Sequence, residues 1–150
     1  MVEEKSPRRS AHRTQWAAQF AVASELCKRG YEVAFTMGNH PSVDLMVISP
    51  NKKPFNIDVK GLYKKNIWGV RARPLRGNLF YVVAYVPNGE ANHFFILSEA
   101  QVNEEVNDEI ERARLRASHK GRSDEKAESF PGVSWKFVEK FKDCWNILPS

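Results

Sequence analysis

Residues 43–60 read VDLMVISPNKKPFNIDVK, and two runs of strand-forming residues around the turn PNKKP predict a β-hairpin. The first run is apolar on both faces, as in a strand covered on two sides, except for the carboxylate of Asp44. In the second run, Asn56, Asp58 and Lys60 share one face because side chains alternate along a strand. This polar face is either functional or exposed.

The pairing of these two strands decides how close their polar side chains come. We expect the turn to pair Ser49 with Phe55. Asp44 then stands opposite Lys60 and diagonal to Asp58, within reach of long side chains. A shift of two residues keeps all three groups on one face, provided that they share that side of the sheet. The sequence therefore predicts that two carboxylates and a lysine converge.

An amphipathic helix is expected before the hairpin. Apolar residues, among them Phe20 and Cys27, recur at three- and four-residue steps over 15–29, and Gly30 ends the helix. Gln19 lies on the apolar face and is expected to face the core. A capping box predicts a helix opening at Ser98. Further strands are expected at 31–36, 67–71, 79–86 and 93–97, and a final amphipathic helix at 137–145.

The 150 residues suit one domain, which we place at 14–150 behind a flexible basic leader, 1–13. No apolar run approaches the roughly 20 residues of a membrane span, and the first residues lack the apolar stretch of a signal peptide, so a cytoplasmic location is expected. The two cysteines lack metal-site spacing and are expected to be buried thiols on helices. The net charge of +5 suits a polyanionic partner but decides little alone.

Two carboxylates and a lysine are the groups that metal-dependent phosphodiester hydrolysis requires. Asp44, Asp58 and the backbone carbonyl of Val59 are the expected ligands of Mg²⁺, with Mn²⁺ as an alternative ion. Lys60 then orients or deprotonates the attacking water, or stabilises negative charge. Gln19 either joins the metal shell or is a core amide bonded to backbone. A decayed site and a structural Asp44–Lys60 ion pair remain alternatives.

The order of helix, strand, Asp44, hairpin and Asp58-Val59-Lys60 resembles the PD-(D/E)XK nuclease superfamily, which includes restriction endonucleases and archaeal Holliday-junction resolvases. The resemblance spans residues 14–97. It implies an α/β fold with a mixed central sheet flanked by helices, in an α-β-β-β-α-β core, and a Mg²⁺-dependent deoxyribonuclease. The chain departs from the pattern at Val43, where proline is common, at Asp58 in place of glutamate, and at Gln19 in place of the helix acid.

A basic segment follows the second hairpin strand and would lie near a bound DNA backbone, with Tyr63 and Trp68 as stacking groups. The expected DNA contacts are Lys64, Lys65, Arg71, Arg73 and Arg76. The alternative is a sheet edge protected by charge. His40 is left outside the catalytic set.

The expected activity is endonucleolytic cleavage of DNA, with a homodimer or a larger protein assembly as the expected partners. One rival is an inactive nuclease-fold module that binds DNA or protein. A second rival is a subunit of a larger system that docks through the polar segment 119–129, which is also expected to be mobile.

Overall fold

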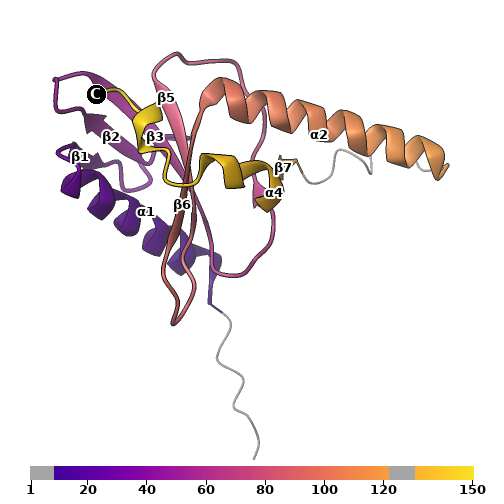
Figure 1. The fold of residues 1–150 in the computed structure, drawn as a ribbon, viewed down its shortest axis with the longest axis horizontal. Coiled ribbons are helices and arrows are strands. Elements are labelled where there is room, and N and C mark those ends of the chain that lie inside the picture. The colour runs from indigo at the N-terminus through magenta and orange to yellow at the C-terminus, as the bar shows by residue number, and fades with distance from the viewer. Residues whose placement is uncertain (1–8, 122–130) are drawn as a thin grey trace, which may run out of the picture.

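A computed structural model describes residues 9–121 and 131–150 and shows a mixed five-stranded sheet in the order β1-β2-β3-β5-β6. Strands β3 and β5 run parallel, and all other neighbours are antiparallel. The predicted mixed sheet flanked by helices is confirmed (Figure 1). The strands of this sheet are β1 (Glu32–Phe35), β2 (Leu45–Ile48), β3 (Pro54–Leu62), β5 (Leu79–Tyr85) and β6 (His93–Ser98).

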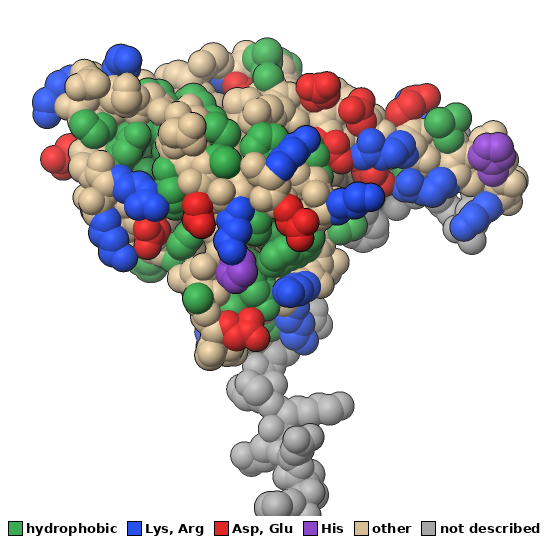
Figure 2. All heavy atoms as spheres, viewed as in Figure 1, with side chains coloured by type: hydrophobic (Ala, Val, Ile, Leu, Met, Phe, Trp, Pro, Cys, Tyr) green, Lys and Arg blue, Asp and Glu red, His purple; other side chains and the backbone are tan. Residues whose placement is uncertain are grey.

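Two helices lie on opposite faces of the sheet. Helix α1 (Ala11–Lys28) packs on one face, and α2 (Glu99–His119) packs on the other and extends beyond the sheet (Figure 1). Acidic and basic side chains alternate along this extension (Figure 2), and Arg112 pairs there with Glu105 and Glu109. The remaining elements are β4 (Trp68–Gly69), β7 (Gly132–Val133), α4 (Trp135–Val138) and the 3₁₀ turns η1 (Glu139–Phe141) and η2 (Trp145–Ile147).

The connection between the parallel strands β3 and β5 departs from the α-β-β-β-α-β order that the resemblance implies. Residues 63–78 are all described, and they contain β4 but no helix. Parallel neighbours usually need a crossover that covers one sheet face. Here β4 pairs with β7, and Trp68 fills that face beneath α4.

Helix α1 begins four residues earlier than expected, because Ser10 caps it and accepts a hydrogen bond from the Arg13 amide. Arg9 donates to the Val86 carbonyl over 2.6 Å. The expected leader 1–13 is therefore wrong for its last five residues, 9–13, which are part of the folded domain. Residues 1–8 lie outside the described residues.

The buried stripe of α1 is rotated away from the expected one. Ala18, Val22 and Leu26 are fully buried, whereas Phe20 is 54% exposed, and Cys27 is exposed rather than a buried thiol. The reason is the close approach of α1 to β3: a Cβ added to Gly61 would lie 2.7 Å from the Ala18 Cβ. Where α1 crosses β3 at Gly61, only a small side chain fits between them. Phe20 therefore lies outside the buried helix face.

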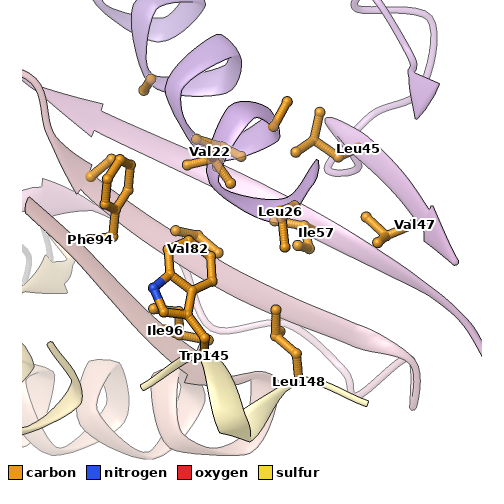
Figure 3. Close-up of a cluster of buried hydrophobic side chains, with 14 of the residues drawn as sticks. Val22, Leu26, Leu45, Val47, Ile57, Val82, Phe94, Ile96, Trp145 and Leu148 are labelled. Carbon is orange, nitrogen blue, oxygen red and sulfur yellow. The ribbon is translucent and has the colours of Figure 1, made fainter. Parts of the chain in front are cut away.

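Two apolar clusters hold these layers together, one on each sheet face. On the α1 face, Val22 and Leu26 meet Ile57 and Val82, and Trp145 closes the cluster from the C-terminal segment (Figure 3). Burial of this surface stabilises the fold by about 25 cal/mol per Å² of apolar area. The predicted strands and the capping box at Ser98 are present.

The expected helix at 137–145 is wrong. Helix α4 ends at Val138, and the chain then turns toward the edge of β6. Asp143 adopts a φ of 54°, and its N–H donates to the Phe94 carbonyl over 2.9 Å. This pairing satisfies backbone groups on the free edge of β6, which a helix at 137–145 would leave without a partner from this segment. Cys144 therefore does not lie on a helix.

Two further expectations concern exposure and mobility. Strand β2 is covered on one side only, because Met46 and Ile48 are 55% and 44% exposed. Of the segment 119–129, residues 119–121 end α2 and its turn, and the rest lies outside the described residues. In the described part of the chain, no helix combines the length and apolar character needed to cross a membrane.

Candidate functional site

The hairpin register differs from the expected one by two residues. Leu45 pairs with Ile57, and the Asp44 N–H donates to the Ile57 carbonyl over 2.9 Å, so Asp44 is not opposite Lys60. The cause is a tighter turn. Ser49 bonds to Lys53 through its backbone N–H and accepts the Lys53 N–H at its Oγ.

Asp44 lies directly before the first residue of β2. Its carboxylate takes the place of a backbone carbonyl as the acceptor for an N–H of β3. The Val59 N–H donates to Asp44 Oδ2 over 2.8 Å. Gln19 Nε2 lies 3.4 Å from Oδ1, and Gln15 Nε2 lies 3.5 Å from Oδ2. Gln19 is 6% exposed, so its predicted position on the buried face is confirmed. The structure thus brings Asp44 and the two glutamines of α1 together.

Asp58 and Lys60 form an ion pair on the α2 face of β3. Lys60 Nζ lies 3.1 Å from Asp58 Oδ1. Asp58 is 2% exposed, whereas the Lys60 side chain keeps 31% of its surface in solvent. The ion pair therefore joins Lys60 to Asp58, and the alternative of a structural Asp44–Lys60 pair is wrong. Asp58 and Lys60 share a face of β3, whereas the Asp44 carboxylate bonds to the Val59 N–H and lies beside the glutamines of α1.

The electrostatic environment of both carboxylates disfavours their charged forms. Burial raises the pKa of Asp58, the Lys60 ammonium opposes this rise, and the nearby Asp44 adds to it. Burial also raises the pKa of Asp44, against the Val59 N–H and Lys60, which lower it. The three charged groups are therefore close enough to influence one another. Asp44 contacts the α1 glutamines, whereas Asp58 and Lys60 pair on the α2 face, so the structure joins the three predicted groups by electrostatic influence and not by direct contact.

The donor set can be tested against a divalent cation. Asp44, Asp58 and the Val59 carbonyl are hard oxygen donors of the kind that Mg²⁺ and Mn²⁺ prefer. In the described part of the chain, no group of three or more histidine, cysteine or acidic side chains could hold a metal. The donor types of these residues suit a hard cation, but the described side chains do not form a ready-made metal cluster.

Gln15 is the residue that the sequence interpretation missed. Its Nε2 donates to the Val59 carbonyl over 2.7 Å, at the atom expected to bind metal. The available signal was its spacing, since Gln15 precedes Gln19 by four residues and therefore shares its helix face. Gln15 and a cation compete for the same oxygen.

The basic residues expected to contact DNA have different environments. Arg76 Nε lies 3.3 Å from Glu99 Oε1, so this side chain is tied to α2. The backbone of Arg73 bonds to the Asn103 side chain, while its charge reaches far enough to lower the pKa of Asp58. Arg71 is exposed. Lys65 lies over the Trp135 ring at 5.5 Å from its centroid.

The two aromatic residues expected to stack on bases also differ. Trp68 is 1% exposed and donates to the Ala84 carbonyl over 3.2 Å, so its expected role as a stacking group is wrong. It serves the core because the connection between β3 and β5 lacks a helix. Tyr63 is half-buried, with Arg9 and Lys64 at 5.1 and 5.4 Å from its ring centroid.

Comparison with known proteins finds no matching family model, no matching curated protein and no matching solved structure.

Proposed function

We propose that this chain is a Mg²⁺-dependent deoxyribonuclease that hydrolyses phosphodiester bonds within DNA. The observation that carries the proposal is the electrostatic influence that Asp44, Asp58 and Lys60 exert on one another where β2 begins beside β3. Burial raises the pKa of both carboxylates. Carboxylates whose pKa is shifted by burial beside a charged partner cluster at functional sites.

The chain's own residues have distinct roles in this proposal. Asp44 and Asp58 would hold the ion, and Val59 would add its carbonyl oxygen once Gln15 releases it. When bound, Mg²⁺ or Mn²⁺ neutralises phosphate charge and acidifies water. Gln19 stays against Asp44 Oδ1 and orients that carboxylate.

Lys60 is the group that can act on the attacking water. Its ammonium is anchored 3.1 Å from Asp58, and its partial exposure lets it reach a substrate from solvent. A positioned ammonium orients the water and stabilises the negative charge that develops on phosphate oxygens. Arg71 and Arg73 lie on the exposed loop that follows β4, where they would contact the DNA backbone.

A specific observation favours a second candidate, a nuclease-fold module that binds DNA without cutting it. Gln15 already occupies the Val59 carbonyl, and Lys60 already neutralises Asp58. A site satisfied in this way is stable without a metal. The two candidates differ in one measurable property, which is turnover.

Cleavage of supercoiled plasmid by the full chain, with Mg²⁺, Mn²⁺ or EDTA, separates them. We expect nicked or linear product with either metal and none with EDTA. Lys60→Ala and Asp58→Asn should lower the rate by about 100-fold or more while leaving DNA affinity in EDTA within about twofold. Lys53→Ala, at the other end of β3, is the matched control. Cleavage that survives in both site variants would contradict the proposal.

Metal binding is tested independently by calorimetry with Mn²⁺. Wild type should bind a stoichiometric ion, and Asp58→Asn should lose it because one of two carboxylate ligands is gone. Binding without cleavage would favour the second candidate. Failure of wild type to bind any ion would contradict the metal-dependent proposal.

A further inference from the structure

A groove of about 580 Å³ lies beside the candidate site, between the first turns of α1 and the end of β3. This volume falls in the range of about 300–1,000 Å³ that is usual for ligand pockets. We call it the α1–β3 groove, and the residues that matter to its chemistry are Arg9, Ala11, Thr14, Gln15, Gly61 and Tyr63.

The groove is continuous with the site. Gln15 lines it and also donates to the Val59 carbonyl over 2.7 Å. Gly61 lines it and directly follows Lys60 in β3. A polymer bound at Asp44 would therefore meet the groove at Gln15, on the α1 face of β3.

The charge of the groove favours an anion. Arg9 is the only charged side chain among the described residues that line it. Its guanidinium is held in place by the Val86 carbonyl and the Asn88 side chain. Those bonds use two of the five N–H donors of a guanidinium. Lys64 adds a second cation, since it and Arg9 both lie within 5.4 Å of the Tyr63 ring centroid.

One of the residues that line the groove carries a buried hydroxyl without a partner. Thr14 is 4% exposed, and its Oγ1 has no hydrogen-bond partner among the described residues. Buried polar atoms are rarely left unpaired, because each costs roughly 1–3 kcal/mol. An oxygen-rich ligand would supply the missing partner. The apolar part of the lining, which includes Ala11 and the Tyr63 ring, suits a sugar.

We propose that the α1–β3 groove binds the sugar-phosphate unit of a DNA strand next to the phosphate that the site cleaves. Arg9 and Lys64 hold the phosphate, the Thr14 hydroxyl bonds to an oxygen of the unit, and Tyr63 packs against the sugar. This inference rests on the proposed nuclease function for the identity of its ligand. It assigns a substrate subsite outside the cation ligands.

Ala11→Glu is the sharpest test, because its effects on folding and on binding have opposite signs. Ala11 is the first residue of α1, where a carboxylate stabilises a helix. In the groove the same carboxylate repels phosphate. Ser24→Glu is the matched control, since it makes the same charge change on an exposed position of the same helix.

Binding is measured by fluorescence anisotropy with a fluorescein-labelled DNA oligonucleotide in EDTA, where no cleavage occurs. We expect Ala11→Glu to weaken binding about tenfold and Ser24→Glu less than about twofold. The melting temperature of Ala11→Glu should equal or exceed that of wild type. Equal weakening by both variants, or none by Ala11→Glu, would overturn the groove as the binding place.

Two further variants test the individual contacts. Arg9→Gln should lower affinity and reduce the slope of log K against log salt concentration by about one, the signature of one lost phosphate contact. Thr14→Val removes only the hydroxyl and should weaken binding a fewfold without changing that slope. A wild-type protein that fails to bind DNA, or an Arg9→Gln slope equal to wild type, would contradict the proposal.

The outcomes separate this inference from the proposed function. Plasmid cleavage that depends on Lys60, together with unchanged binding by Ala11→Glu and Arg9→Gln, would refute the groove and leave the nuclease proposal intact. Loss of binding in those variants, without plasmid cleavage by any form, would support the groove and refute the nuclease.

Discussion

The Gln15 side chain donates a hydrogen bond to the Val59 carbonyl over 2.7 Å, at the oxygen that would complete a cation site. The same amide lies 3.5 Å from Asp44 Oδ2. Gln15 therefore stabilises the arrangement without metal and would compete with a cation at the proposed site. In the proposed metal site, the Gln15 side chain would therefore set the affinity for the ion.

Gln15→Glu should make folding depend on a divalent cation. The new carboxylate cannot donate to Val59 and repels Asp44, so the melting temperature in EDTA should fall. With saturating Mn²⁺ the third carboxylate becomes a ligand, and the rise in melting temperature should exceed that of wild type. Thermal unfolding with and without Mn²⁺ measures this difference. Ser24→Glu, which adds the same charge away from the site, should respond as wild type does. A Gln15→Glu response to Mn²⁺ no larger than that of wild type would contradict the competition.

Asp58→Asn should stabilise the metal-free protein at neutral pH. Burial raises the pKa of Asp58 in the folded state, so between the unfolded and folded pKa values the native state binds more protons. Stability contributed by this group is therefore greatest at low pH and falls as pH rises through the folded pKa. The gain from Asp58→Asn should be largest at pH 7–8 and shrink toward pH 4. Urea unfolding across this range in EDTA measures the gain. A gain that grows as pH falls would contradict the raised pKa.

The polar face of the hairpin could be predicted from sequence because alternation in β3 is strict. Its register could not, since it depends on the turn at Ser49 and on Lys52, which adopts a left-handed φ of 67°. Periodicity likewise located α1 but misplaced its buried stripe. The stripe depends on the contact between Ala18 and Gly61, which lie far apart in the chain.

Gly61→Ala should destabilise the protein, because the added Cβ would lie 2.7 Å from the Ala18 Cβ and 3.1 Å from the Thr14 carbonyl oxygen. Overpacking of this kind costs about 1–3 kcal/mol. Ala18→Gly alone should cost about 1 kcal/mol in the helix interior. The double variant should lose less stability than the two single variants lose together, since removing the Ala18 Cβ relieves the contact. Urea unfolding of the three variants measures this coupling, and simple additivity would show that α1 does not press on β3.

Arg76→Ala and Arg71→Ala should separate a structural arginine from one available to DNA. Arg76 pairs with Glu99, which is 4% exposed and also accepts the backbone N–H groups of Arg76 and Gly77. Because the Arg76 side chain is one-third exposed, its loss should cost only about 1 kcal/mol. Arg71→Ala should leave the melting temperature unchanged and weaken DNA binding more than Arg76→Ala does, with a salt slope lower by about one. Thermal unfolding and DNA-binding anisotropy of both variants test this assignment. If Arg76→Ala kept the wild-type melting temperature and lost more DNA affinity than Arg71→Ala, the two roles would be reversed.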